Sequence, residues 1–217
     1  MRERMAQAAA RAGRSAQSVT LLAVSKAQPP ELVRAAADCG LNDFGESYLQ
    51  EALPKLDALR DRPLTWHFVG RLQANKTQPI AASFAWVHAL ERLKIAARLS
   101  EARSPHLPPL NVCLQVNVAG ETSKGGVAPA ELGSLARAVA ALPRLKLRGL
   151  MCIPPQETQP ERQRVWFREL RRLYAALNAD GAGLDTLSMG MSGDFEAAIE
   201  EGATIVRVGT ALFGPRE

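Results

Sequence analysis

The stretch Leu21-Leu22-Ala23-Val24-Ser25-Lys26 joins an apolar run to a lysine. Four consecutive apolar residues between polar ones predict a short strand buried on both faces, as in a parallel sheet covered by helices. Lys26 ends this strand, and α/β folds place their ligands at such strand ends. Partial desolvation there would lower the pKa of the amine and favour its attack on a carbonyl group. The alternative, a lysine whose ammonium group reaches water, stays open.

The composition is that of an ordinary globular protein and excludes several classes. Of 217 residues, 47% are hydrophobic and 23% charged, which is enough apolar material for one sizeable core. The net charge of +5 is scattered over arginines without a dense basic block, and aromatic residues make up only 5%. This pattern argues against a nucleic-acid partner and favours anionic small ligands.

The three cysteines, Cys39, Cys113 and Cys152, are far apart in apolar surroundings. An odd number with this spacing argues against a disulfide framework or a metal site and indicates a reducing compartment. The chain has no apolar run of the roughly 18 to 20 residues that a membrane span needs. Residues 1–13 include Glu3 and lack the apolar centre of a secretory signal. We therefore expect a cytoplasmic protein without membrane contact.

Strand and helix patterns alternate along the whole chain. Apolar runs predict the strands, and glycines and prolines mark the ends of most elements. The predicted strands are 21–26, 43–47, 64–70, 84–90, 110–118, 145–153, 186–192 and 205–213. The predicted helices are 1–12, 29–39, 48–59, a short one before Pro79, 91–102, 129–143, 161–178 and 194–201.

This alternation predicts one (β/α)8 TIM barrel over residues 1–217. Eight strand–helix units in 217 residues leave about 27 residues each, which is short but sufficient. A doubly wound open sheet is the alternative. No long linker or change of composition indicates a second domain.

Two glycine-containing segments occupy the places where barrels commonly bind phosphate, after the seventh and eighth strands. The segment 188–194 has two glycines and Ser192 before a helix, where free N–H groups and the helix dipole favour an anion. In the second segment, which we predict to lie within the eighth strand, Gly209 would let a phosphate approach the backbone and Thr210 offers a hydroxyl. The alternative is that these glycines only permit tight turns and close strand packing.

Because a barrel closes its eighth strand onto its first, Lys26 and this phosphate cradle would be neighbours. Pyridoxal 5′-phosphate (PLP), an aldehyde that carries a phosphate and binds lysine as a Schiff base, fits both. The sequence also resembles the pyridoxal phosphate homeostasis protein family over about residues 20–214. The segments that carry the resemblance are A-V-S-K (23–26), F-G-E-S-Y (44–48), H-F-V-G-R-L-Q-A-N-K (67–76), S-K-G-G (123–126), R-G-L-M (148–151), L-S-M-G-M-S-G-D (187–194) and R-V-G-T-A-L-F-G (207–214).

The resemblance implies a barrel related to the N-terminal domain of bacterial alanine racemase. It implies that Lys26 forms the internal aldimine and that Arg207 faces the pyridine nitrogen. A permanently charged guanidinium keeps that nitrogen unprotonated, so the ring is a weaker electron sink than one facing a carboxylate. The residues implied to hold the phosphate are Ser192, Gly193, Gly209 and Thr210.

Two other positions near the expected mouth bear on the site. Ser47 departs from the family pattern, which usually has asparagine, and the shorter side chain changes any contact with the cofactor. His67 lies at a predicted strand tip beside the mouth, where it is a candidate acid or base. A histidine bonded to a neighbouring loop is the alternative.

Five further residues have both a functional and a structural interpretation. Asn75 and Lys76 would line the mouth or cap the next helix. Lys124 would offer a second amine near the cofactor, although we expect a solvated loop lysine. Met189 and Met191 flank the phosphate segment, where packing is the expected role.

The favoured function is a non-catalytic PLP carrier or regulator with no metal and no catalytic residues. The alternative is a PLP-dependent amino-acid racemase, which needs a base on each face of the substrate carbanion. In alanine racemase the second base comes from a partner's β-domain, and here the sequence reaches Glu217 as the barrel closes, so we expect no such domain. A sugar-phosphate aldolase or phosphatase agrees with the residues but not with the resemblance. The expected partners are PLP, PLP-dependent apo-enzymes and free amino acids, and the expected state is a monomer.

Overall fold

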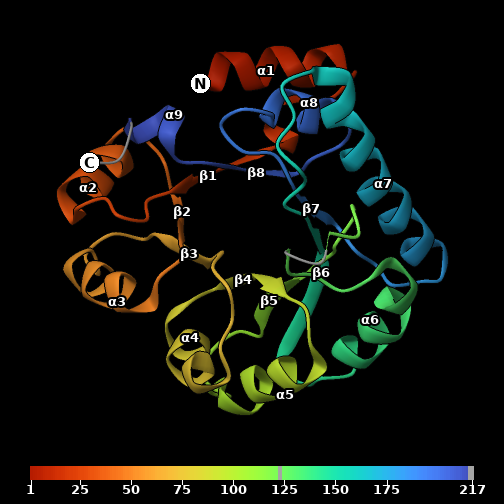
Figure 1. Ribbon diagram of the computed structural model, residues 1–217. Helices are drawn as coiled ribbons and strands as arrows, with labels where there is room; N and C mark the ends of the chain where they lie inside the picture. Colours follow the sequence, from red (N-terminus) through yellow and green to blue (C-terminus); the bar gives the residue numbers. More distant parts are fainter. Residues whose placement is uncertain (122–123, 215–217) are drawn as a thin grey trace.

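The computed structural model describes residues 1–121 and 124–214. Its sheet is a closed barrel of eight strands in the order β1 to β8, with every neighbouring pair parallel. Helices form an outer ring around it (Figure 1). The (β/α)8 prediction is therefore confirmed. The strands are β1 (Thr20–Val24), β2 (Asp43–Glu46), β3 (Thr65–Phe68), β4 (Trp86–Leu90), β5 (Leu110–Gln115), β6 (Leu145–Met151), β7 (Thr186–Ser188) and β8 (Ile205–Val208).

The main hydrophobic core lies between the barrel and its helices, and the buried faces of the helices supply it. Short 3-10 turns at Ala16–Ser18, Ala74–Lys76 and Pro129–Glu131 complete the connections. The helices are α1 (Arg2–Arg11), α2 (Pro30–Asp38), α3 (Leu49–Ala58), α4 (Thr77–Ser83), α5 (Leu93–Ala102), α6 (Leu132–Ala140), α7 (Pro160–Ala179), α8 (Phe195–Glu200) and α9 (Thr210–Phe213).

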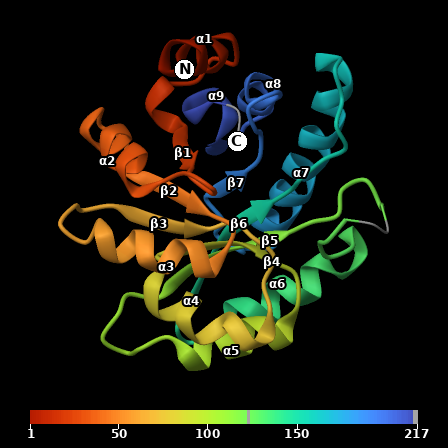
Figure 2. The ribbon, with the colours of Figure 1, turned by 60° about the vertical axis from the view of Figure 1, so that its left-hand side comes forward.

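The N-terminal helix covers the place where β8 closes onto β1. The helix after β8, α9, has only four residues. Because α9 is so short, helix α1 covers this part of the barrel and packs against α8, with Met5, Ala8 and Ala9 buried. Both views place α1 beside the closing strands (Figures 1 and 2). The register of this closure pairs Leu22 with Arg207, so the two strands that carry the predicted site are direct neighbours.

Several strands end earlier than predicted, and the eighth differs most. The segment 205–213 was expected to be one strand, but β8 ends at Val208 and residues 210–213 form α9. Pairing with β1 stops at Ala23 and Val208, so the chain beyond has no partner strand to keep it extended. Strand β7 ends at Ser188 because Gly190 takes a left-handed conformation, with φ of +92°. These early ends place the 188–194 segment in a loop over the barrel, and they place Gly209 and Thr210 at the turn from β8 into α9.

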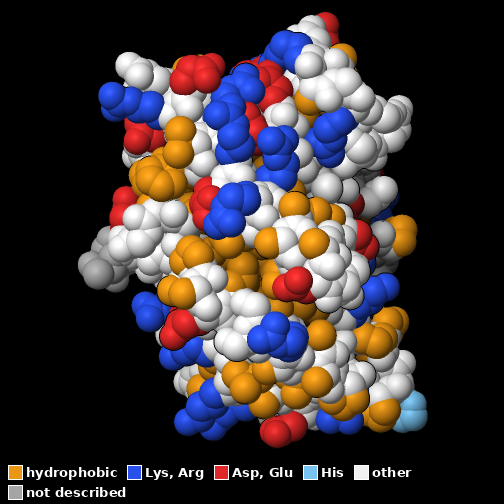
Figure 3. Space-filling view, turned by 90° about the vertical axis from the view of Figure 1, so that its right-hand side faces the viewer, with side chains coloured by type: hydrophobic (Ala, Val, Ile, Leu, Met, Phe, Trp, Pro, Cys, Tyr) orange, Lys and Arg blue, Asp and Glu red, His pale blue; other side chains and the backbone are white. Residues whose placement is uncertain are grey.

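The face of the molecule in Figure 3 carries basic and acidic side chains over both its upper and lower parts, and they mix most closely near the top. Glu201 alone pairs with Arg164, Arg168 and Arg171, at 3.6, 2.9 and 3.5 Å. These pairs join α7 to the end of α8. Within the described residues, no helix combines the length and apolar character that crossing a membrane requires.

Candidate functional site

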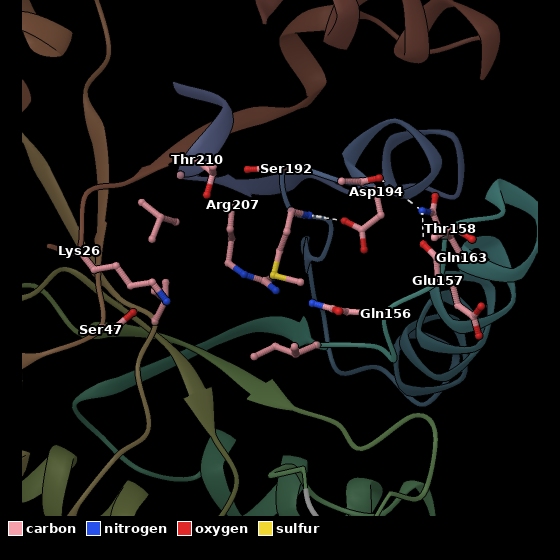
Figure 4. A pocket seen from close by; sticks show the side chains of 16 residues that line it. Lys26, Ser47, Gln156, Glu157, Thr158, Gln163, Ser192, Asp194, Arg207 and Thr210 are labelled. Carbon is pink, nitrogen blue, oxygen red and sulfur yellow. Dashed lines mark hydrogen bonds between the residues drawn. The ribbon is translucent and has the colours of Figure 1, made fainter. Parts of the chain in front are cut away.

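A cavity of about 710 Å³ opens at the C-terminal end of the barrel. This is within the usual size range of small-molecule sites, roughly 300 to 1,000 Å³. Lys26 and Ser47 form one side, and the segment from β6 to α7 forms the other (Figure 4). The lining residues are Val24, Lys26, Ser47, Val69, Ile153, Gln156, Glu157, Thr158, Gln163, Met191, Ser192, Gly193, Asp194, Arg207, Gly209 and Thr210. All six predicted site residues are among them.

Lys26 lies in a turn just beyond β1, two residues after the strand ends, and not in the strand as predicted. The turn is closed by a hydrogen bond from Gln28 N to Ser25 O, and Ala27 has a left-handed φ of 60°. This conformation costs a non-glycine residue about 1–3 kcal/mol. The strained turn carries the partly buried Lys26 side chain into the cavity, toward Arg207 (Figure 4).

A buried ion pair fixes the residue before Lys26. Lys55 Nζ donates to Glu46 Oε1 at 2.6 Å and to the Ser25 carbonyl at 2.7 Å. The Ser25 hydroxyl donates to the same carboxylate oxygen at 2.7 Å. Sequence reasoning missed this cluster, although Ser25 and Glu46 belong to two of the quoted motifs. The cluster therefore ties Ser25, the residue before Lys26, to the end of β2 and to α3.

The loop between β7 and α8 lies over the barrel and presents open backbone to the cavity. Met191 N donates to Asp194 Oδ1 at 2.5 Å, which closes the loop on itself. A Cβ on Gly190 would lie 2.5 Å from that of Ala198, whereas one on Gly193 would meet nothing within 4 Å. Gly190 is thus required by packing, and Gly193 is an open position at the cavity wall. Burial raises the pKa of Asp194, and the bond from Met191 opposes this shift.

The loop after β8 is joined to the first loop by a hydrogen bond. Ala211 N, at the start of α9, donates to Ser192 Oγ at 3.3 Å. A Cβ on Gly209 would come within 3.1 Å of the Val24 carbonyl, so glycine lets this loop lie against β1. Thr210 is exposed at the rim and faces the same space as Ser192 (Figure 4). The bond from Ala211 to Ser192 joins the two predicted phosphate segments into one wall, in which Ser192, Gly193, Gly209 and Thr210 line the cavity.

Arg207 supplies a buried positive charge at the floor of the cavity. Its Nη1 donates to the carbonyl and hydroxyl oxygens of Ser188, at 2.6 and 3.0 Å, and its Nη2 donates to the Cys152 carbonyl at 2.9 Å. Burial lowers the pKa of the guanidinium, but from a starting value so high that the group stays charged. Three of its five N–H groups are committed to these contacts.

The opposite wall comes from the segment between β6 and α7. Gln163 Nε2 donates to the Glu157 carbonyl at 2.8 Å and to the Gly193 carbonyl at 3.3 Å. This side chain therefore joins the wall to the β7–α8 loop. Gln156 and Thr158 also face the cavity from this side (Figure 4).

The prediction that His67 lies beside the mouth is wrong. His67 is buried inside the barrel, where its ring nitrogens contact His88 at 2.9 Å and Asp43 at 3.1 Å. Asp43 is the first residue of β2, so His67 reaches toward the end of the barrel opposite the cavity. These two polar contacts hold the ring inside the barrel, where it also stacks on Trp86 with centroids 5.3 Å apart.

The remaining candidates separate into lining, packing and distant residues. Met191 lines the cavity, and Met189 is fully buried in the core. Asn75 and Lys76 lie in the 3-10 turn before α4 and do not line the described cavity. Lys124 pairs with Glu121 at 2.9 Å and lines a second hollow of about 430 Å³ with Arg71, Glu91 and Gln115. Ser123 of the same motif lies outside the described residues.

The arrangement suits a small phosphorylated carbonyl compound. An amine enters from one side, a guanidinium forms the floor, and the N–H groups and hydroxyls of two loops form an anion-type wall. Gly193 leaves open space where any side chain would intrude. The residues present therefore fit a lysine-bound, phosphate-bearing cofactor. Among the residues that the structure describes, no group of three or more His, Cys, Asp or Glu is arranged to hold a metal ion.

The fold and the cavity define a barrel of the alanine racemase N-terminal class. The sequence profile of the family described as "Alanine racemase, N-terminal domain" matches residues 1–217. Alanine racemase from Corynebacterium glutamicum has the same fold, with a TM-score of 0.70 and 19% identity over 99% of this chain and 60% of the enzyme.

Closer relatives define the family. The pyridoxal phosphate homeostasis protein of Pseudomonas aeruginosa is 60% identical over 99% of this chain and 92% of its own length. That of Escherichia coli K12 is 47% identical over 100% and 94%. PipY of Synechococcus elongatus PCC7942, solved with PLP bound, has a TM-score of 0.86 and 36% identity over 97% of this chain and 100% of PipY. The chain belongs to the pyridoxal phosphate homeostasis protein family.

Proposed function

We propose that this protein binds PLP as a Schiff base on Lys26 and takes part in the intracellular homeostasis of the cofactor, without substantial catalytic turnover. The observation that carries the proposal is the placement of Lys26 and Arg207 across one cavity, beside the two joined loops. The family relatives bear the name of this function, and PipY was solved with PLP bound.

Each predicted residue has a distinct role in this proposal. Lys26 holds the aldehyde carbon covalently, with loss of water. Arg207 donates an N–H group to the pyridine nitrogen and keeps that nitrogen unprotonated. The phosphate lies against Ser192, Gly193, Gly209 and Thr210, where N–H groups and hydroxyls bind charged oxygens. When bound, the cofactor supplies an electrophilic carbon to which amines can add.

The acid–base groups at the cavity favour a carrier over an enzyme. Racemisation needs two bases, one on each face of the substrate carbon. The described lining residues with ionisable side chains are Lys26, Glu157, Asp194 and Arg207. Asp194 is bonded to its own loop, and both interior histidines are committed inside the barrel. An open mouth also leaves water to screen developing charge. The alternative remains a PLP-dependent amino-acid racemase.

The covalent link is tested with Lys26→Ala. We expect the variant to lose the visible absorption band of the protonated imine, while the phosphate wall retains weak binding. Borohydride reduction of the wild type followed by peptide mass spectrometry should place the label on Lys26. Lys124→Ala and Lys76→Ala are the matched controls and should keep the band. A band that survives in Lys26→Ala after dialysis would refute the assignment.

The phosphate loops are tested with Ser192→Ala and Thr210→Ala. Each should weaken PLP binding by about 1–3 kcal/mol, the usual loss for a hydrogen bond to a charged group. Pyridoxal, which lacks the phosphate, should bind poorly to the wild type and be nearly indifferent to both changes. Equal losses for pyridoxal would mean that the loops act through folding.

The absence of turnover is tested by incubating the PLP-loaded protein with L-alanine and other L-amino acids in deuterated water. We expect no exchange of the Cα proton at an enzymatic rate. Exchange or racemisation faster than about 1 per second, the lower end of ordinary turnover numbers, would restore the racemase.

We also propose a single-domain, monomeric, cytoplasmic protein whose partners are PLP-dependent apo-enzymes and free amino acids. The support for a reducing compartment is that Cys39, Cys113 and Cys152 are all free thiols. A tight dimer in sedimentation at micromolar concentration would overturn the monomer.

A further inference from the structure

A chain of polar side chains crosses the interior of the barrel and ends at Arg207. Arg207 Nη1 lies 3.0 Å from Ser188 Oγ, which lies 2.7 Å from His88 Nδ1. His88 Nε2 lies 2.9 Å from His67 Nδ1, and His67 Nε2 lies 3.1 Å from Asp43 Oδ1. The four inner members are at least nine-tenths buried, and Asp43 is partly exposed at the opposite end.

These contacts have one consistent direction. The Asp43 carboxylate only accepts, so His67 carries its proton on Nε2 and donates it to Asp43. In a neutral ring, His67 Nδ1 is then bare and accepts from His88 Nε2–H, which leaves His88 Nδ1 bare to accept the proton of the Ser188 hydroxyl. Ser188 Oγ itself accepts from Arg207, because a guanidinium only donates. As neutral rings, both imidazoles are thus Nε2–H tautomers.

The surroundings support neutral rings. Burial lowers the pKa of His67 and, more strongly, that of His88, which the positive charge of Arg207 lowers further. Opposing charge reaches the pair from Asp43 on β2, which raises the pKa of His67 by its hydrogen bond. The charged side chains that face the pair from the β6 side are Arg148 and Asp185. They pair with each other at 2.8 Å, so their opposite charges offset, and Arg148 also lies over the ring of Trp86.

We infer that Ser188, His88 and His67 are positioning residues for Arg207, which fix its guanidinium so that its remaining N–H groups aim at the ring nitrogen of the bound cofactor. The inference rests on the proposed function. Without an acceptor at His88 Nδ1, the Ser188 hydroxyl could turn its proton toward Arg207 and lose the contact. The Arg207 side chain would then be more mobile in the free protein. Ordering it on ligand binding would cost conformational entropy and so weaken the affinity.

The tautomers give a test that needs no ligand. The protein has only three histidines, so selective 15N labelling resolves all of them. We expect two imidazoles locked as Nε2–H through neutral pH, and exposed His106 serves as the reference signal. An Nδ1–H tautomer or a protonated ring at either interior position at neutral pH would refute the assigned direction of the hydrogen bonds between Arg207 and Asp43.

Variants test the positioning role. Ser188→Ala and His88→Leu should weaken PLP binding by about tenfold, the lower end of the loss for a hydrogen bond to a charged group. His88→Asn keeps an acceptor near the Nδ1 position and should restore most of the affinity. Ser100→Ala removes another buried serine, on α5, and should leave affinity unchanged.

The decisive ligand is 1-deaza-PLP, which keeps the aldehyde and phosphate but has carbon in place of the ring nitrogen. Its affinity should be nearly the same in wild type, Ser188→Ala and His88→Leu. If the variants lose affinity for both ligands equally, they act through folding and the inference fails, although the proposed function stands. If the wild type binds no PLP, the proposed function fails and the role at the ring nitrogen fails with it.

Discussion

Replacing Lys55 with methionine tests the ion pair beneath the lysine turn. The Lys55 and Glu46 side chains are 5% and 0% exposed, and the second carboxylate oxygen, Oε2, has no partner among the described contacts. Lys55→Met therefore leaves a buried carboxylate with the Ser25 hydroxyl as its donor. Removing one partner of a buried pair typically costs about 3–5 kcal/mol. For a chain of this size the melting temperature should fall by roughly 6 to 20 °C.

An exposed pair with the same shortest nitrogen–oxygen distance is the control. Arg34 and Asp61 also lie 2.6 Å apart, but their side chains are 37% and 55% exposed. Arg34→Met should cost only about 0–1 kcal/mol because water screens the pair. Both costs are measured as free energies of unfolding in urea. If Lys55→Met costs no more than Arg34→Met, burial does not govern the ion pair and the reasoning is wrong.

A double variant separates the charge from the packing. Glu46→Leu combined with Lys55→Met replaces the pair with apolar side chains of similar volume. Such replacements are often neutral or stabilising by about 1–4 kcal/mol. We expect the double variant to be more stable than Lys55→Met alone. That result would mean that the main role of the intact pair is to hold the residue before Lys26 in place, and that its net contribution to the free energy of unfolding is small.

Three further outcomes are expected. Burial lowers the pKa of the two interior histidines in the folded protein, so on acidification these side chains are protonated in the unfolded chain before they are protonated in the folded one. The free energy of unfolding should therefore be unaffected by these groups above about pH 6.5 and should decrease below it. Urea midpoints measured at several pH values should show this decline, less steeply in His88→Asn, and a rise on acidification would contradict it. Gly190→Ala should lower the free energy of unfolding in urea by about 1–3 kcal/mol, and Gly193→Ala should change it little. The reason is that, of these two glycines, only Gly190 has a positive φ and a blocked Cβ position. Equal costs for the two variants would contradict this reasoning. Burial raises the pKa of the two buried cysteines to about 12, so a thiol reagent should label Cys39 alone in the native protein, and rapid labelling of a second cysteine would count against the structure.

The local sequence determined the elements and the place of the site. Apolar runs ended by glycine or proline predicted eight strands and their helices, because side-chain periodicity and backbone restriction act over a few residues. The closed order of β1 to β8 then brings Lys26 and the 188–194 segment to one mouth. Strand ends were less predictable, as at β8, since a strand ends where its neighbour's hydrogen bonds end.

Only the tertiary structure decided which polar groups meet inside the barrel. Lys55 and Glu46 are nine residues apart on different elements, and His88 and Ser188 are 100 residues apart. No local pattern distinguishes these residues from solvent-exposed ones. His67 shows the consequence. Its place at a predicted strand tip led us to expect it beside the mouth of the barrel, but its hydrogen-bond partners, His88 and Asp43, hold it inside. Periodicity assigns a residue to an element, but its hydrogen-bond partners depend on how distant strands align when the barrel closes.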